Sequence, residues 1–354
     1  MPPPLRSGYS TGACAAAAAK GAALLLRAGR TPEEIELTLP TGAGARFSPH
    51  RWRLSPDGAT CSVIKDAGDD PDVTNGVEVI ATVRQTPGAT VHIVGGVGIG
   101  RVTKPGLAVP VGEWAINPTP RRMIEQAVRE IYPDGGWLVT ISIPDGTERA
   151  KKTLNARLGI IGGLSILGTT GIVRPVSAQA WTDTIDTALD VAEAVHCPTV
   201  VLATGRTSEL AAMRHYADLP EEAFIMMGDH VAHALQSCKR HGFMQPALAC
   251  QFAKLVKIAC GYPNTHAAAS RLDLSQLIGW LRTAGATRQL LDTATDAHTA
   301  RELAITSGYA PLLMRTVCRQ ALAAVHHHAP DLTPELLISR YDAAPPLSCR
   351  CLIG

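Results

Sequence analysis

The sequence is poor in aromatic and charged residues, and this excludes several classes of protein. Aromatic residues make up 4% of the chain, too few for an extended platform on which nucleic-acid bases stack. Charged residues make up 18%, and the formal net charge is only +2, whereas nucleic-acid binders concentrate a basic excess on one face. We therefore expect no nucleic-acid partner, and any anionic ligand must be bound by a local cluster of cations.

The chain also lacks long apolar runs and paired cysteine motifs. No window reaches the roughly 18 uncharged apolar residues of a membrane span, so we expect no membrane partner. The alanine-rich N-terminus resembles a secretion signal, but Lys20 interrupts it and the leucines at 24–26 follow the small residues. The nine cysteines include no CxxC pair, which indicates neither a disulfide framework nor a zinc ribbon. A reducing, cytoplasmic location and no resident metal are the expectations.

The first half of the sequence predicts an α+β domain. Apolar residues make up 46% of 354 residues, enough for two domains with separate cores. Ser10-Thr11-Gly12 precedes an alanine-rich run, which predicts a helix that extends to about Arg27 and ends at Gly29. A second helix is expected after Pro118. Short β patterns separated by Gly, Pro and Asp turns lie at residues 35–39, 60–65, 77–83, 91–94 and 137–143. This domain is assigned to residues 1–170.

The second half has a different rhythm. Helical patterns at residues 178–195, 208–216 and 229–241 alternate with short apolar runs at 199–203, 223–226 and 246–249. This alternation is typical of βαβ units, and it predicts an α/β Rossmann-like domain with a parallel sheet. From about residue 272 onward the pattern is mainly helical. We assign this domain, with its helical C-terminal part, to residues 171–354.

A glycine-rich segment follows the strand predicted at residues 91–94. Its spacing is GxGxG rather than the GxGxxG of dinucleotide-binding folds, Pro105 follows soon after, and no Gly-Lys-Ser/Thr completes a Walker loop. It is either a tight glycine turn or a close backbone approach to a flat ligand, with Arg101 and Lys104 just beyond.

An acidic turn occupies residues 65–76. It fails as a calcium loop, because Pro71 replaces the glycine of the sharp turn and Val77 replaces the closing Glu. The four aspartates either cap turns on a solvated loop, or repel one another enough to raise one pKa and create a proton acceptor.

Five stretches in fixed order together resemble the CbiD family, and the resemblance runs from about residue 5 to about residue 274. The stretches are RSGYSTGAC (residues 6–14), KDAGDDPDVT (65–74), GGVGIGRVTKPGL (95–107), PVGEWAINP (110–118) and GLSILGTTGIVRP (163–175). Two places depart from the family pattern. Residues 250–254 read Cys-Gln-Phe-Ala-Lys instead of a Gly-His-x-Gly-Lys-like turn, and Ala267 replaces a more typical Ser after Thr265-His266.

The resemblance implies transfer of a methyl group from S-adenosylmethionine to ring carbon 1 of cobalt-precorrin-5B, giving cobalt-precorrin-6A, in cobalamin biosynthesis. Cobalt enters only as part of this corrinoid substrate. Two alternatives remain open: a pyridine-nucleotide-dependent tetrapyrrole oxidoreductase, or a non-catalytic corrinoid-binding protein. A homo-oligomer is possible.

The chemistry that the resemblance implies selects three groups of residues. Attack by the ring carbon leaves positive charge or an extra proton on the ring, so the catalytic candidates are carboxylates: Asp66, Asp69, Asp70 and Asp72. The acetate and propionate side chains of the substrate need Arg forks and helix N-termini, which gives these candidates: Arg6, Ser10, Thr11, Gly12, Lys65, Gly96, Gly98, Arg101, Lys104, Arg121 and Arg174. Donor-binding candidates follow two strands of the second domain: Thr204, Gly205, Arg206, Glu209 and Asp229. Solvated surface charge is the rival interpretation for any single cation, and helix capping is the rival for Asp229.

Overall fold

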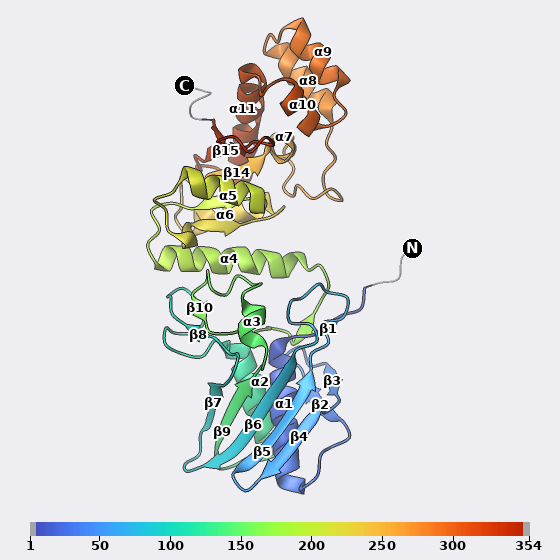
Figure 1. Ribbon diagram of the computed structural model, residues 1–354, viewed down its shortest axis with the longest axis vertical. Coiled ribbons are helices and arrows are strands. Elements are labelled where there is room, and N and C mark those ends of the chain that lie inside the picture. The colour runs from blue at the N-terminus through green and yellow to red at the C-terminus, as the bar shows by residue number, and fades with distance from the viewer. Residues whose placement is uncertain (1–4, 350–354) are drawn as a thin grey trace. The chain divides into compact units, whose positions relative to one another are not determined.

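The computed structural model describes residues 5–349, and the chain divides into two compact units, Met1–Ser177 and Ala178–Gly354. We call these the N-terminal unit and the C-terminal unit. Each combines helices with sheet, so the fold is mixed α/β (Figure 1). The division lies between Ser177 and Ala178, whereas the sequence placed it between residues 170 and 171.

The N-terminal unit is built from short strands, two longer helices and one short helix. In chain order these are β1 (Gly8–Tyr9), α1 (Thr11–Ala28), β2 (Ile35–Thr38), β3 (Gly44–Phe47), β4 (Arg51–Ser55), β5 (Gly58–Ile64), β6 (Glu78–Thr86), β7 (Val91–Gly95), β8 (Arg101–Val102), α2 (Pro118–Arg129), β9 (Gly136–Ser142), α3 (Gly146–Ala150), β10 (Ile160–Ile161) and β11 (Ile172–Val173).

A five-stranded sheet in the order β4-β5-β6-β9-β7 carries the core of this unit. Neighbouring strands run antiparallel except β7 and β9, which are parallel. Val79, Ala81 and Val83 of β6 alternate with less buried residues, as expected for a strand with one face on a core. The helices α1 and α2 pack beside each other against the sheet (Figure 1).

The alanine-rich helix α1 lies unusually close to its neighbours. Its N-cap Ser10 accepts a hydrogen bond from the N–H of Ala13, and Gly29 ends the helix in the left-handed conformation, so both predicted ends are confirmed. An added Cβ at Gly21 would lie 2.6 Å from Ile35 Cδ1 and 2.7 Å from Cys61 Sγ. Small side chains are therefore what allow this helix to pack so closely.

The C-terminal unit contains helices and the strands of a single sheet. In chain order these are α4 (Ala178–Ala194), β12 (Val201–Ala203), α5 (Arg206–His215), the 3-10 helix η1 (Glu221–Ala223), β13 (Phe224–Met226), α6 (Val231–Arg240), β14 (Ala247–Gln251), α7 (Phe252–Ala259), α8 (Leu274–Thr283), α9 (Arg288–Asp296), α10 (Ala300–Thr306), α11 (Pro311–His328), β15 (Glu335–Ser339) and β16 (Leu347–Ser348).

The sheet of this unit has the order β13-β12-β14-β15-β16. The strands from β13 to β15 are parallel, and β16 is antiparallel to β15. The three predicted strands and their intervening helices are present with slightly shifted ends. The strand β15 was missed, because the sequence predicted a mainly helical region beyond residue 272. It is a fully paired member of the sheet, with Leu336, Leu337 and Ile338 buried.

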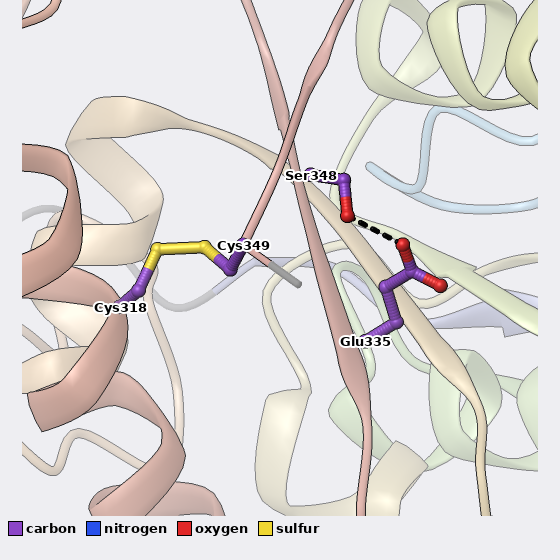
Figure 2. Close-up of a disulfide and its surroundings, with 4 residues drawn as sticks. All are labelled: Cys318, Glu335, Ser348 and Cys349. Atoms are coloured by element: carbon purple, nitrogen blue, oxygen red, sulfur yellow. Dashed lines mark hydrogen bonds between the residues drawn. A yellow bond between two sulfur atoms is a disulfide. The ribbon is translucent and has the colours of Figure 1, made fainter. Parts of the chain in front are cut away.

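A disulfide joins Cys318 of α11 to Cys349 (Figure 2). Beside it, the Ser348 hydroxyl donates to a carboxylate oxygen of Glu335 at 2.6 Å, across the β15–β16 pair. The cysteine count did not indicate this bond. The other cysteines that the structure describes are free.

Candidate functional site

The first candidate cluster joins the chain before α1 to the acidic turn. The Arg6 guanidinium forms a two-pronged ion pair with Asp66, at 2.5 and 2.9 Å, and this lowers the pKa of the carboxyl. The Arg6 N–H donates to Asp69 at 2.6 Å. An added Cβ at Gly8 would lie 2.1 Å from the Ala67 carbonyl carbon, so the two segments are in backbone contact. The structure thus brings together two of the five stretches that carry the family resemblance.

The other two aspartates of the turn have different partners. The side chain of Lys65 is 1% exposed, and its ammonium donates to Asp72 at 2.7 Å. Burial opposes ionisation of Asp72, but hydrogen bonds from Lys65 and Thr74 lower its pKa. Asp70 accepts from the N–H of Val176 at 3.0 Å. Lys65 is therefore part of a buried ion pair, which is not the exposed cation that binding of a carboxylate requires.

The start of α1 is buried beneath another segment of the N-terminal unit, the loop that carries Leu167. Ser10 and Thr11 are each 3% exposed. The N–H of Gly12 donates to the Leu167 carbonyl at 3.0 Å, and the Thr11 hydroxyl oxygen accepts from the Leu167 N–H at 3.0 Å. The Ser10 hydroxyl caps Ala13. These donors and acceptors hold Leu167 against the helix, so the N–H groups of Gly12 and Ala13 are already used inside the unit.

The glycine-rich segment after β7 is packed closely against neighbouring segments of the N-terminal unit. An added Cβ at Gly96 would lie 2.3 Å from Ser142 Oγ, and one at Gly98 would lie 1.9 Å from the Ile143 carbonyl oxygen. Gly98 also has a φ of +73°, which favours glycine. The close approach at both positions is to the protein, and this favours the tight-turn interpretation.

The Arg121 guanidinium donates hydrogen bonds to three backbone carbonyls. Its Nε donates to Ile116 at 2.9 Å, and its terminal nitrogens donate to Ile93 at 3.1 Å and Trp114 at 3.4 Å. A longer contact of 3.8 Å reaches Glu113. These bonds fix α2 to the loops beside it and leave little of the guanidinium for a ligand.

Arg101 and Arg174 are two exposed cations of the N-terminal unit that form no ion pair within residues 5–349. One Arg101 nitrogen donates to the Gly112 carbonyl at 2.6 Å, and the guanidinium lies 4.0 Å from the centre of the Trp114 ring. Arg174 is exposed and forms no ion pair within residues 5–349. Lys104 is half-buried and donates to a backbone carbonyl at 3.3 Å. Arg101 and Arg174 are therefore better placed to meet a ligand carboxylate than Arg121.

A hollow of about 630 Å³ opens between α1 and the β2–β3 hairpin, with Tyr9 in its lining. Its charged side chains are already neutralised, because Lys20 pairs with Glu130 and Arg46 lies 3.5 Å from Glu36. A hollow without net positive charge does not match a polyanionic ligand.

The second candidate cluster lies where the parallel strands of the C-terminal unit end. After β12, the Thr204 N–H donates to Ala249 of the next strand at 3.0 Å. An added Cβ at Gly205 would meet no described atom within 4 Å, so its backbone faces open space. Glu209, in the first turn of α5, is fully buried and pairs with Arg206. The loop therefore offers open backbone beside a buried carboxylate.

The end of β13 carries Asp229, whose carboxylate receives hydrogen bonds from Lys254 and, at 2.6 Å, from the Thr265 hydroxyl. Partial burial opposes its ionisation, but these bonds lower the pKa of Asp229. The Trp181 ring lies against Gly228, and its Nε1 donates to the Met227 carbonyl at 3.1 Å. The N-cap position of α6 is taken by His230, and within residues 5–349 the hydrogen bonds to the Asp229 carboxylate come from Lys254 and Thr265.

Lys254, Lys257 and Thr265 were missed as site residues. The sequence contains a signal: two lysines lie three residues apart in the helix after β14, and the first of them, Lys254, falls in the segment that departs from the family pattern. Since one helical turn separates them, they lie on one face of α7. Only the fold shows that the loop holding Thr265 returns to them.

Two further findings concern the part of the chain that the structure describes. No group of three or more His, Cys, Asp and Glu side chains there is placed to hold a metal ion. No helix there combines the length and hydropathy that a membrane crossing requires.

By fold and site, the chain is a two-unit mixed α/β protein whose ionisable side chains gather on loops at helix and strand ends, the usual position of binding and catalytic residues. The model of the CbiD family matches residues 1–175. A relative from Pelobacter propionicus is 55% identical, with 95% of this chain and 94% of the relative covered. A relative from Geobacter sulfurreducens is 54% identical, with 96% and 97% covered. Both are named cobalt-precorrin-5B C(1)-methyltransferase. The chain belongs to the CbiD family.

A solved structure of a cobalamin biosynthesis protein (cbiD) from Archaeoglobus fulgidus is 31% identical to this chain. The two structures align over 71% of this chain and 78% of the Archaeoglobus fulgidus chain, with a TM-score of 0.40.

Proposed function

We propose that this chain transfers a methyl group from S-adenosylmethionine to ring carbon 1 of cobalt-precorrin-5B, giving cobalt-precorrin-6A. The observation that carries the proposal is the 55% identity to a cobalt-precorrin-5B C(1)-methyltransferase over 95% of the chain. No nucleophile from the protein is required, because the ring carbon itself attacks the methyl group. The protein instead orients the two reactants and excludes water, effects worth about 7–11 kcal/mol in well-oriented intramolecular reactions.

The corrinoid substrate is assigned to the N-terminal unit. Its acetate and propionate groups need exposed cations, and we assign that role to Arg101 and Arg174. Further candidates are the half-buried Lys104 and Arg6, which is exposed although it pairs with Asp66. Lys65 and Arg121 are assigned to holding the loops, since their donors are occupied inside the unit.

The aspartates of the acidic turn divide into two roles. Asp66 and Asp72 have lowered pKa values, so they stay ionised and suit the stabilisation of positive charge that develops on the ring. A low pKa also makes them weak proton acceptors. The residue proposed to accept a proton is Asp70, which is half-buried and accepts one N–H from Val176; Asp69 is the second candidate.

The methyl donor is assigned to the C-terminal unit, which we propose to be a doubly wound, Rossmann-like domain. In support, β12 pairs in parallel with β13 on one side and β14 on the other, so the chain reverses its direction across the sheet at β12. Ligands of such sheets bind beyond the carboxyl ends of the strands at that reversal. Thr204 and Gly205 lie there.

The residues at that edge fit the donor. The open backbone at Gly205 allows close approach of the methionyl part. The buried Glu209 is assigned to orienting its partner Arg206, whose exposed guanidinium can reach the ligand. Asp229 is held ionised by Lys254 and Thr265, and we assign it to positioning these side chains at the strand end. When bound, the donor supplies an electrophilic methyl group on sulfonium sulfur.

The proposal is tested with purified protein, cobalt-precorrin-5B and S-adenosylmethionine. We expect S-adenosylhomocysteine to form only when the corrinoid is present, and calorimetry to detect binding of S-adenosylmethionine but not of NADPH. Binding of NADPH with reduction of the ring would favour an oxidoreductase. Binding of the corrinoid without any S-adenosylhomocysteine would leave a non-catalytic binding protein.

The division of roles is tested with single variants. Arg101→Ala and Arg174→Ala should raise the KM for the corrinoid and leave donor affinity unchanged. Asp70→Asn should lower kcat with little change in corrinoid affinity, by roughly 100-fold or more if it acts as a general base. If Asn substitution of all four aspartates in turn left kcat unchanged, the turn would have no catalytic role.

A further inference from the structure

Two lysines of α7 lie beside Asp229 at the carboxyl end of the parallel sheet. The strand β14 runs into α7 with no intervening loop (Figure 1). Lys254 and Lys257 therefore lie within two helical turns of the carboxyl end of β14. After α7 the chain returns to the end of β13, where the Thr265 N–H donates to the Asp229 carbonyl at 3.0 Å.

Both lysines converge on one backbone oxygen. The Thr265 carbonyl accepts from the Lys254 ammonium at 3.3 Å and from the Lys257 ammonium at 2.9 Å. The two positive charges are therefore neighbours. Burial and the charge of Lys254 together lower the pKa of Lys257, and the more distant Asp229 only partly opposes this.

The charges at this place do not balance. Lys254 forms an ion pair with Asp229, while the residues that the structure describes bring no carboxylate within ion-pair distance of Lys257. Lys254 and Asp229 are 31% and 24% exposed, so a ligand can reach the group from solvent. Two ammonium groups facing one carboxylate leave an uncompensated positive charge, which an anion would neutralise.

We propose that Lys254 and Lys257 form a binding site for one carboxylate group of a ligand. The proposal rests on the proposed function and adds to it, because Lys257 lies outside the donor-binding residues expected from the sequence. Two ligands of the reaction supply a carboxylate: the methionyl end of the methyl donor, and the acidic side chains of the corrinoid. The position beyond β13 and β14 favours the methionyl carboxylate.

The test compares S-adenosylhomocysteine with methylthioadenosine, which has the same nucleoside and thioether but no carboxylate. Calorimetry is carried out on the full chain and on Lys257→Met, with Lys257→Arg to restore the charge. Lys239→Met, at a lysine of α6 that pairs with Asp331, is the matched control.

We expect Lys257→Met to weaken S-adenosylhomocysteine binding at least about tenfold, the effect of losing one charge-assisted hydrogen bond. Methylthioadenosine binding should stay unchanged, which also shows that the variant is folded. Lys257→Arg should recover most of the affinity, and Lys239→Met should match the wild type. If affinity for cobalt-precorrin-5B falls instead, the site holds a carboxylate of the corrinoid.

Two results would overturn the proposal. A methyl-transfer assay on the wild-type protein shows whether the carboxylate site alone is wrong or the proposed function fails with it. If Lys257→Met binds both ligands normally while the wild type still transfers methyl, the carboxylate site is wrong and the proposed function stands. If the wild type binds neither ligand and transfers no methyl, both fail.

Discussion

Replacing either member of the buried Lys65–Asp72 pair should destabilise the N-terminal unit, by unequal amounts. The Lys65 side chain is 1% exposed and that of Asp72 is 24% exposed. In Asp72→Asn the ammonium keeps its buried position without a counter-charge. The cost of keeping this unpaired charge buried cannot exceed the cost of removing the proton, because the lysine would otherwise become neutral. For an ordinary lysine at pH 7 that cost is about 4.6 kcal/mol. We expect a loss of about 4 kcal/mol in the free energy of unfolding.

In Lys65→Met the remaining partner is better placed to tolerate the change. Asp72 keeps the N–H and hydroxyl of Thr74 and part of its contact with water. Only the charge-assisted hydrogen bond is lost, which costs about 2–3 kcal/mol. The double variant, with methionine at 65 and asparagine at 72, should be more stable than Asp72→Asn alone, since no unpaired charge is left buried.

The pH dependence separates this explanation from a loss of packing. If the unpaired ammonium is buried without its proton in folded Asp72→Asn, the unfolded chain holds one more proton than the folded chain. The loss of stability relative to wild type should then shrink as pH rises above 7, by up to about 1.4 kcal/mol per pH unit. Lys65→Met has no such group and should show no rise. Denaturant unfolding at pH 7, 8 and 9 measures both. The reasoning is refuted if both variants lose the same amount of stability, below about 1 kcal/mol, or if the stability of Asp72→Asn does not change with pH. If Lys65→Met is as stable as wild type but has lost affinity for the corrinoid, Lys65 is a substrate ligand after all.

Three other outcomes follow from the packing. Cys318→Ser should lower the free energy of unfolding by roughly 3–4 kcal/mol, as should reductant on the wild type, because the disulfide closes a loop with a sequence separation of 31. Gly98→Ala should lower the melting temperature far more than Gly112→Ala: both have positive φ, but only the first would place a Cβ 1.9 Å from backbone. Burial opposes protonation of His241, but a backbone carbonyl and Asp190 raise its pKa above the usual value. Its contribution is therefore present at low pH and lost as pH rises through the folded value, so Asp190→Asn should reduce stability at pH 5.5 and have little effect above about pH 8.

The parts of the fold that local signals determine were predictable. The helix α1 has an N-cap serine, a run of alanines and a terminal glycine, and all three act where the sequence places them. Strands β12, β13 and β14 alternate with helices, and this rhythm is visible in the apolar pattern. The strand β15 has a similar apolar run, but five helices separate it from β14, with which it pairs. A local pattern does not reveal a pairing across so long a separation.

The candidate site was less predictable, because the burial of a polar side chain is set by tertiary contacts. At the end of β5 the apolar Ile64 is exposed and Lys65 is buried, the reverse of what hydropathy suggests. The helix start at Ser10 looked suited to an anion, but its donors are used by Leu167, more than a hundred residues away. The proximity of the two lysines of α7 to Asp229 depends on the loop that carries Thr265, and the sequence alone does not show that this loop folds back onto α7.

The most direct test of the central claim is the position of the transferred carbon. Purified protein is incubated with cobalt-precorrin-5B and S-adenosylmethionine labelled in its methyl group, and the corrinoid product is examined by mass spectrometry and NMR. We predict a product that has gained one labelled methyl group, bonded to ring carbon 1. A label on any other ring carbon, or an unlabelled corrinoid recovered from protein that binds both ligands, would contradict it.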